Sequence, residues 1–145
     1  MTPEPSYVVD TSVLVRWYLA QVGWEHARKV RDLYIGGEIE LVTVECARYE
    51  MPWVLRKKGL LAGALTLPEY LAASRTIDDF GIAVFVPDAD AIEECAALSV
   101  THGITFFDAM FVLHSLRSGS VLLTADQRLA RSAGSLVATA VLEGI

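Results

Sequence analysis

Two apolar runs at opposite ends of the chain each stop at an aspartate. Near the start, the run YVV is followed by Asp10, and near the end the run VLLTA is followed by Asp126. A stretch that can form a helix comes directly after each aspartate. The carboxyl ends of parallel strands in an open α/β sheet collect at one edge, where ligands bind. The two aspartates are therefore expected to share one site.

Apolar, β-branched runs alternate with helical stretches along the whole chain. This alternation predicts a single α/β domain with a central, mostly parallel sheet and helices on both faces. Strands are expected at 7–10, 40–44, 82–86, 120–124 and 136–141. Helices are expected at 11–19, 24–35, 45–58, 66–79, 88–103, 106–116 and 127–133. No internal repeat or long linker divides the chain, and residues 1–6 are expected to form a short lead-in.

Charge and composition restrict the classes of function. The 145-residue chain has a net charge of −6, whereas a protein that binds nucleic acid mainly by neutralising phosphates carries a basic excess. An enzyme that holds nucleic acid through metal ions and a local basic strip remains possible. Cys46 and Cys95 form no zinc pattern and are expected to be small buried residues. No uninterrupted apolar run of roughly 18 residues occurs. A cytoplasmic protein that does not associate with a membrane is expected.

Four acidic residues are candidates for the shared site, although ordinary explanations exist for three of them. Asp10 and Asp126 follow strands, where an aspartate also serves as a helix N-cap. Asp108 stands where a capping box with Thr105 would place an acid, but the helix after it is apolar on nearly every side. Glu50 lies in an apolar helical stripe and has no basic residue three or four positions away. A lone charge buried there needs a partner.

Carboxylates that crowd together must hold either protons or a cation. Two like charges about 4 Å apart repel by roughly 4 kcal/mol at an effective dielectric constant of about 20. Oxygen ligands without cysteine or histidine favour Mg²⁺ or Mn²⁺ over zinc. Because Mg²⁺ readily meets phosphate oxygens, the expected chemistry is phosphodiester hydrolysis by a metal-bound water. The chain contains no glycine-rich nucleotide loop and no G-x-S-x-G motif that would indicate another chemistry.

Four segments taken in order carry a resemblance to a known family. They are VVDTS at 8–12, YE at 49–50 with VLRKKG at 54–59, FDAMFV at 107–112 and TADQRLA at 124–130. The chain resembles the PIN domain family from residue 7 to about 142, and more narrowly the VapC-type toxins of type II toxin–antitoxin pairs. The resemblance implies a PIN-like nuclease domain over 7–142 that acts as an Mg²⁺- or Mn²⁺-dependent endoribonuclease on RNA. It also implies a VapB-like antitoxin as partner and a homodimer.

The resemblance assigns roles to the four acids. Asp10 and Asp108 match the first and third acids of the family and would be the principal metal ligands. Glu50 and Asp126 match the second and fourth acids and would complete a catalytic pocket. An antitoxin is expected to inhibit by placing a basic side chain, arginine, in this pocket. The apolar helix around Trp53 and the helix at 67–71 are candidates for an exposed interface.

Two details of the pocket stay open. Ser12 and Thr124 match hydroxyl positions of the family and would hydrogen-bond carboxylates or metal-bound water, or serve only as junction and capping residues. Pro52 removes a backbone donor and is expected to kink or restart its helix, which leaves the direction of Glu50 open. Glu45 is the substitute candidate, but five residues is a poor helical repeat, so Glu50 is preferred.

Two other classes of function remain. A phospho-accepting receiver domain also gathers acids at strand ends, but it needs a late lysine, and this chain has none after Lys58. A catalytically silent PIN-like binding scaffold is the second alternative, because acids alone do not establish turnover.

Overall fold

The computed structural model describes residues 4–145, so residues 1–3 of the expected lead-in lie outside the described residues. The strands are β1 (Ser6–Val9), β2 (Glu40–Val44), β3 (Ala83–Phe85), β4 (Val121–Thr124) and β5 (Thr139–Val141). The helices are α1 (Thr11–Val15), α2 (Trp24–Ile35), α3 (Glu45–Leu55), α4 (Leu67–Ala73), α5 (Thr76–Asp79), α6 (Ala89–His102), α7 (Phe106–Ser118) and α8 (Gln127–Ala133).

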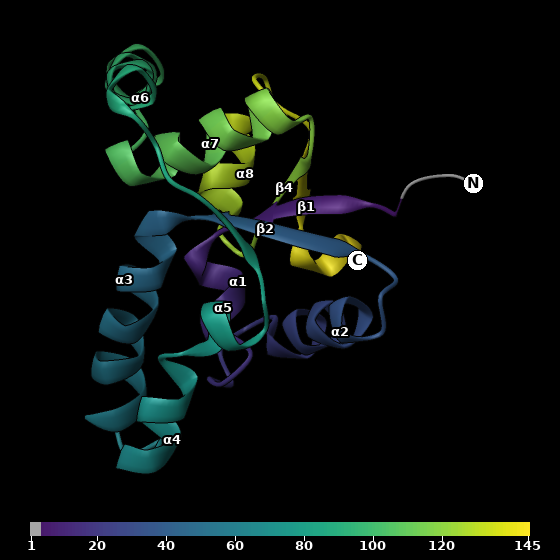
Figure 1. The fold of residues 1–145 in the computed structure, drawn as a ribbon, viewed down its shortest axis with the longest axis vertical. Coiled ribbons are helices and arrows are strands. Elements are labelled where there is room, and N and C mark those ends of the chain that lie inside the picture. Colours follow the sequence, from purple (N-terminus) through teal and green to yellow (C-terminus); the bar gives the residue numbers. More distant parts are fainter. Residues whose placement is uncertain (1–3) are drawn as a thin grey trace.

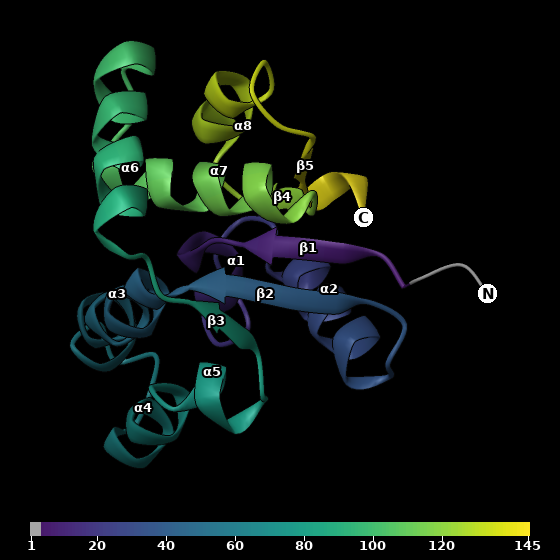
Figure 2. The same cartoon turned by 45° about the horizontal axis from the view of Figure 1, so that its top comes forward.

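The five strands form one sheet in the order β3-β2-β1-β4-β5, and every neighbouring pair is parallel. Helices α6, α7 and α8 lie on one side of this sheet, and α1, α2 and α3 lie on the other (Figures 1 and 2). The predicted α/β fold with a parallel sheet is therefore confirmed. Parallel sheets between two helical layers are buried on both faces, which is why their strands read as continuous apolar runs.

The core lies where β1 meets its two neighbours. Val8 pairs with Val42 of β2 and with Leu122 of β4, and the side chains of Val8 and Leu122 are fully buried. Helix α7 packs across this centre, and its residues from Ala109 to Leu113 are all buried. The centre of the sheet thus fixes the position of the ends of β1 and β4.

The prediction for α1, for the helix at 66–79 and for the last strand differs from the structure in length or continuity. Helix α1 stops at Val15 rather than at residue 19, because the N–H groups of residues 16–18 bond to carbonyls three residues back and tighten the last turn. The single helix predicted at 66–79 is two helices, α4 and α5, and the hydroxyls of Ser74 and Thr76 bond to backbone carbonyls at the break. The last strand begins at Thr139, because Leu136 and the next residue still bond to the end of α8.

The predicted restart of the helix at Pro52 is wrong. Helix α3 continues through Pro52 to Leu55 and passes into a π-helical turn over Arg56–Leu60. A proline inside a helix costs about 3 kcal/mol. Met51 and Leu55 on either side of it are almost completely buried, and their packing holds the helix in place.

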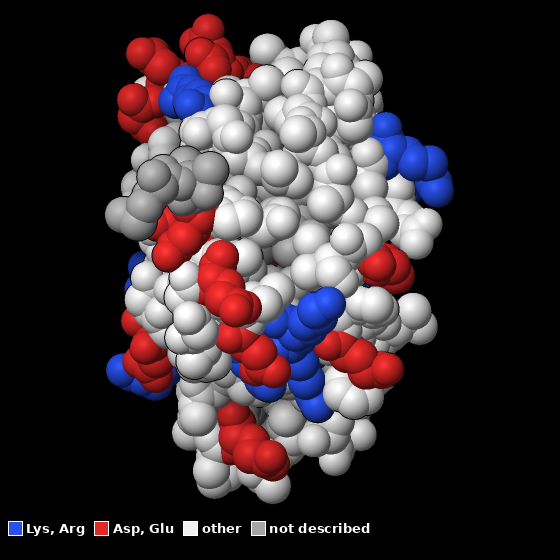
Figure 3. Space-filling view, turned by 90° about the vertical axis from the view of Figure 1, so that its right-hand side faces the viewer, with Lys and Arg blue, Asp and Glu red and all other residues white. Residues whose placement is uncertain are grey.

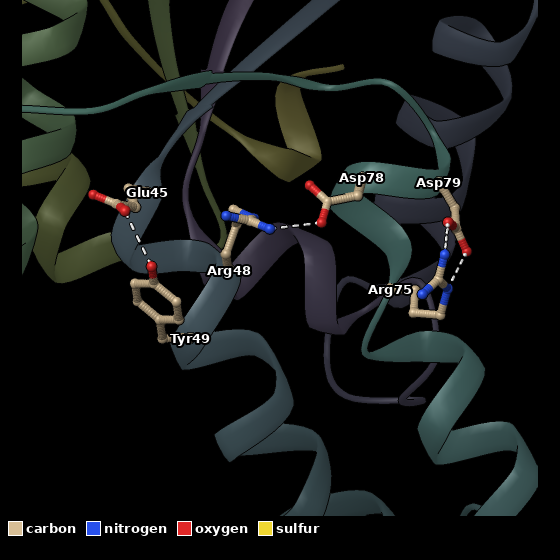
Figure 4. A network of polar contacts seen from close by, with 6 residues as sticks. All are labelled: Glu45, Arg48, Tyr49, Arg75, Asp78 and Asp79. Atoms are coloured by element: carbon tan, nitrogen blue, oxygen red, sulfur yellow. Dashed lines mark hydrogen bonds and ion pairs between the residues drawn. The ribbon is translucent and has the colours of Figure 1, made fainter.

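Helix α5 is tied to α3 by a surface ion pair (Figure 4). Arg48 of α3 donates to Asp78 of α5 at 2.7 Å, while Arg75 and Asp79 pair four residues apart. Such exposed pairs contribute at most about 1 kcal/mol each, so they orient the short helix without determining the fold.

Among the described residues, no single helix is long and apolar enough to cross a membrane. Helices α6 and α7 reach that length and hydropathy only as a pair, and they are bent by 111° at the break between them.

Candidate active site

The site forms where β1 and β4 end side by side. Val9 pairs with Leu123, and the N–H of Asp10 still donates to the Leu123 carbonyl at 3.3 Å. The chain then turns into α1 after Asp10 and toward α8 after Thr124. Residues from the two ends of the sequence therefore meet at one edge of the sheet, as the sequence predicted.

Asp10 occupies the N-cap position of α1 but does not cap this helix with its side chain. Its carboxylate instead accepts hydrogen bonds from two hydroxyls, the Oγ of Ser12 and the Oγ1 of Thr124, the latter at 2.6 Å. Each hydroxyl also accepts a backbone N–H: Ser12 from Ala125 at 3.0 Å and Thr124 from Asp126 at 2.9 Å. Because an ionised carboxylate can only accept, both hydroxyls donate their protons to Asp10.

The burial of Asp10 changes its acidity. Its side chain is only 5% exposed, and burial raises its pKa from 3.8 to about 6. The hydrogen bonds from Ser12 and Thr124 act in the opposite direction, and the negative charge of Asp108 adds to the rise in pKa. The surroundings of Asp10 therefore favour its neutral, protonated form more than water does.

Glu50 points from α3 toward the start of α1. Its Oε1 accepts a hydrogen bond from the Thr11 hydroxyl at 3.2 Å, and the Cys46 thiol lies one helical turn before it on the same helix. Burial raises the pKa of Glu50, hydrogen bonds from Cys46 and Thr11 lower it, and the charge of Asp108 raises it. Cys46 is buried as predicted, and burial together with Glu50 raises the pKa of its thiol.

Thr11 was missing from the predicted site residues. The available signal was its position directly after Asp10, at the first residue of the helix, where a hydroxyl can reach across to a neighbouring element. The substitute candidate Glu45 lies elsewhere: its carboxylate accepts a hydrogen bond from Tyr49 at 3.0 Å on the same helix (Figure 4).

Asp108 and Asp126 line one cavity near the starts of α7 and α8. The backbone N–H of Asp108 donates to Thr105, and its half-buried carboxylate has a pKa raised mainly by burial and also by Asp126. Asp126 is exposed and caps α8, because its Oδ1 accepts the N–H groups of Arg128 at 2.9 Å and Leu129 at 3.3 Å. Asp126 therefore has an ordinary local role as well as a place beside Asp108.

The four acids influence each other through Asp108, since its charge acts on Asp10 and Glu50 and the charge of Asp126 acts on it. Within residues 4–145, no three His, Cys, Asp or Glu side chains come close enough together to enclose an ion. An ion surrounded by protein ligands does not fit this arrangement. Mg²⁺ usually takes one or two carboxylates and keeps several waters, so two neighbouring acids are enough to hold it.

The fold and these side chains define an α/β domain whose candidate ligand site lies at the carboxyl edge of a parallel sheet. A model of the PIN domain family matches residues 7–135, and the chain belongs to this family. Ribonuclease VapC3 of Pyrobaculum aerophilum is 29% identical over 134 residues, which span 90% of this chain and 96% of the relative. The family predicted from the four sequence segments is thus confirmed.

Solved structures share the fold at low sequence identity. VapC20 of Mycobacterium tuberculosis, a toxin that cleaves the sarcin–ricin loop, has a TM-score of 0.70 and 19% identity, covering 91% of this chain and 96% of that one. VapBC2 of Rickettsia felis, bound to a DNA fragment from its promoter, has a TM-score of 0.64 and 9% identity. The match covers 94% of this chain and 98% of that one.

The first prediction concerns Asp10→Asn in the metal-free protein. Native Asp10 keeps its proton up to about pH 6, whereas unfolded Asp10 loses it near 3.8, so stability falls as the pH rises between these values. The variant is expected to be more stable than the wild type by about 3 kcal/mol at pH 7 to 8, and equal to it below the lower pKa. Urea denaturation in EDTA across this range measures the difference. A variant that is less stable at pH 7 would contradict the buried-charge explanation.

The second prediction concerns Thr11→Val, which keeps the shape of the side chain and removes its hydroxyl. Because the Thr11 hydrogen bond lowers the pKa of Glu50, its loss is expected to raise that pKa further. Thr11→Ser retains the donor and is the matched control. NMR titration of the Glu50 carboxyl carbon measures both variants, and equal pKa values in the two would show that the bond is not formed.

Proposed function

We propose that this chain is an Mg²⁺- or Mn²⁺-dependent endoribonuclease and the toxin of a VapBC-type pair in the cytoplasm, with its nuclease domain over residues 7–142. The observation that carries the proposal is the buried Asp10 carboxylate, which lies at the junction of β1 and β4 under the charge of Asp108. A charge in that position destabilises the metal-free protein, and a cation that meets the charge removes this cost. The family match and the relative named as a ribonuclease support hydrolysis of RNA.

In this proposal each acid has a separate task. Asp10 and Asp108 hold the ion, which when bound supplies a Lewis acid and an acidic water for attack on phosphorus. Ser12 and Thr124 orient the Asp10 carboxylate through their hydroxyl protons. Glu50 has a raised pKa and lies half-buried, and it accepts the proton released during the attack.

Asp126 has less freedom than the other three acids. Its Oδ1 is taken by the first turn of α8, so only Oδ2 can reach a water or an ion. Its contribution is therefore a fixed negative charge beside Asp108, which favours the bound cation.

The solved VapBC2 complex supports a VapB-like antitoxin as partner. An acidic pocket accepts an arginine side chain in place of a metal ion, because the paired N–H donors of the guanidinium match a carboxylate. Apolar side chains on α3 and α4 support an interface with an antitoxin or a second copy in a homodimer. Tyr49 and Trp53 are 63% and 61% exposed, and Leu67 and Leu71 are each 55% exposed.

The alternative is a scaffold of the same fold that binds partners without cleaving RNA. It would retain the antitoxin surface but would have no need for a buried charge at Asp10. Cleavage by the purified wild type in Mn²⁺, and its loss in EDTA, separates the two functions.

The third prediction is that Asp10→Asn and Asp108→Asn each abolish Mn²⁺-dependent cleavage of structured RNA. Each variant loses a ligand charge, while the core of the fold is unchanged. Cleavage is measured by gel electrophoresis of end-labelled RNA, with circular dichroism as the test of folding. The matched control is Asp32→Asn on the surface of α2, which is expected to cleave as the wild type does. Wild-type rates in a folded Asp10→Asn variant would refute the assignment.

The fourth prediction tests the ion without reference to catalysis. Binding to the native state alone stabilises a protein by about 2.7 kcal/mol at a hundredfold excess over Kd. Mn²⁺ is therefore expected to raise the Tm of the wild type and of Asp32→Asn, and to leave those of Asp10→Asn and Asp108→Asn unchanged. Differential scanning calorimetry with and without Mn²⁺ gives the comparison. Equal shifts in all four proteins would place the ion elsewhere.

A further inference from the structure

A small cavity lies beside the acids, between the loop after α6 and the start of α8. Its volume is about 140 Å³, and its polar lining comes from Thr105, Asp108, Asp126, Arg128 and Ser132. Pockets that enclose a drug-sized ligand measure about 300–1,000 Å³. The cavity is therefore suited to one compact group rather than to a whole nucleotide.

Arg128 is the positive charge of this cavity. Its backbone N–H donates to Asp126 at 2.9 Å, which fixes the start of α8, and its side chain is exposed. Its charge lowers the pKa of Asp108, but within residues 4–145 no carboxylate lies within ion-pairing distance of its guanidinium. The donors of Arg128 are therefore available to an anion.

The other arginine near the acids is already engaged. Arg16 donates from Nε to the Val22 carbonyl at 2.8 Å and from Nη1 to the Ser12 carbonyl at 2.7 Å. Its guanidinium thus braces the end of α1. On the face around the two chain ends, most Lys and Arg side chains lie beside Asp or Glu (Figure 3). Arg128 is distinguished by its place, because it is the basic residue that lines the cavity beside Asp108 and Asp126.

We propose that Arg128 binds a backbone phosphate of the RNA substrate in this cavity, with the Ser132 hydroxyl as a second donor. This inference rests on the proposed ribonuclease function and names how the substrate is held. A guanidinium presents paired N–H donors that match two phosphate oxygens, and a hydroxyl adds a third hydrogen bond. The carboxylates of Asp108 and Asp126 would repel a phosphate by themselves, so the positive charge of Arg128 is needed to admit it.

The test compares Arg128→Ala with Arg128→Lys and with Arg131→Ala, an exposed arginine on the same helix that does not line the cavity. Loss of a charge-assisted phosphate contact is expected to raise KM for a short single-stranded RNA by about 10-fold or more in Arg128→Ala. Arg128→Lys keeps the positive charge but lacks the paired N–H donors of the guanidinium. Its KM is expected to lie between those of the wild type and Arg128→Ala. Arg131→Ala is expected to match the wild type.

Salt dependence supplies a readout that a structural role would not change. Each phosphate contact on a single strand contributes a slope of about −0.7 to the logarithm of affinity against the logarithm of salt concentration. Arg128→Ala is expected to reduce the slope by about that amount, and Arg131→Ala is not. A KM and slope equal to those of the wild type in Arg128→Ala would overturn the phosphate site while leaving the ribonuclease function intact.

If the wild type cleaves no RNA in Mn²⁺, the ribonuclease function fails and RNA binding decides the phosphate site separately. Fluorescence anisotropy with a labelled RNA oligonucleotide in Mn²⁺ then measures Kd for the same variants. An increase of about 10-fold in Arg128→Ala but not in Arg131→Ala supports the site. Equal Kd values in both overturn it.

Discussion

The hydrogen bonds that hold the Asp10 carboxylate join the two halves of the site. Ser12 and Thr124 donate to Asp10 and at the same time accept backbone amides of the segment that follows β4. The junction after β1 is thereby fixed to the junction after β4, and the carboxylate oxygens have fixed directions. Removal of either hydroxyl would leave a buried charge with fewer donors and a backbone amide without its acceptor, both of which are costly in the interior. Asp126 is attached directly to this network, because its N–H donates to Thr124.

The acids differ in burial, and this difference assigns them different chemistry. Asp10 is almost completely buried, Glu50 and Asp108 are half-buried, and Asp126 is exposed. Burial raises the pKa of the first three, and Asp108 adds its charge to the effect on Asp10 and Glu50. In the metal-free state the site therefore holds protons more readily than isolated carboxylates do. A cation that meets Asp10 and Asp108 would reverse this preference, so binding of the ion and release of protons are coupled.

The architecture of the sheet could be predicted from the sequence because apolar runs and the helices between them carry strong local signals. The differences have two causes, tertiary packing at Pro52 and local side-chain-to-backbone hydrogen bonds at the break between α4 and α5. Packing of Met51 and Leu55 keeps α3 intact through Pro52, and the hydroxyls of Ser74 and Thr76 divide the helix predicted at 66–79. Three of the candidate acids, Asp10, Asp108 and Asp126, could be selected because they stand at helix starts, whereas Glu50 lies in the middle of α3 and was selected from its apolar helical stripe. The hydrogen bond from Thr11 to Glu50 joins residues 39 positions apart, so the sequence shows only the position of Thr11 after Asp10 and not its partner.

The start of α8 shows why local structure alone does not explain this site. Asp126 caps the helix through one oxygen, and asparagine caps as well as aspartate does. Folding of α8 therefore does not require the negative charge, which also raises the pKa of Asp108 nearby. The same turn places Arg128 at the cavity with its backbone fixed by that cap. The helix therefore does not account for the charge of Asp126, which lies beside another acid. It also lies next to Arg128, which has no ion-pair partner among the described residues. A ligand that carries both a cation and a phosphate accounts for this combination of charges.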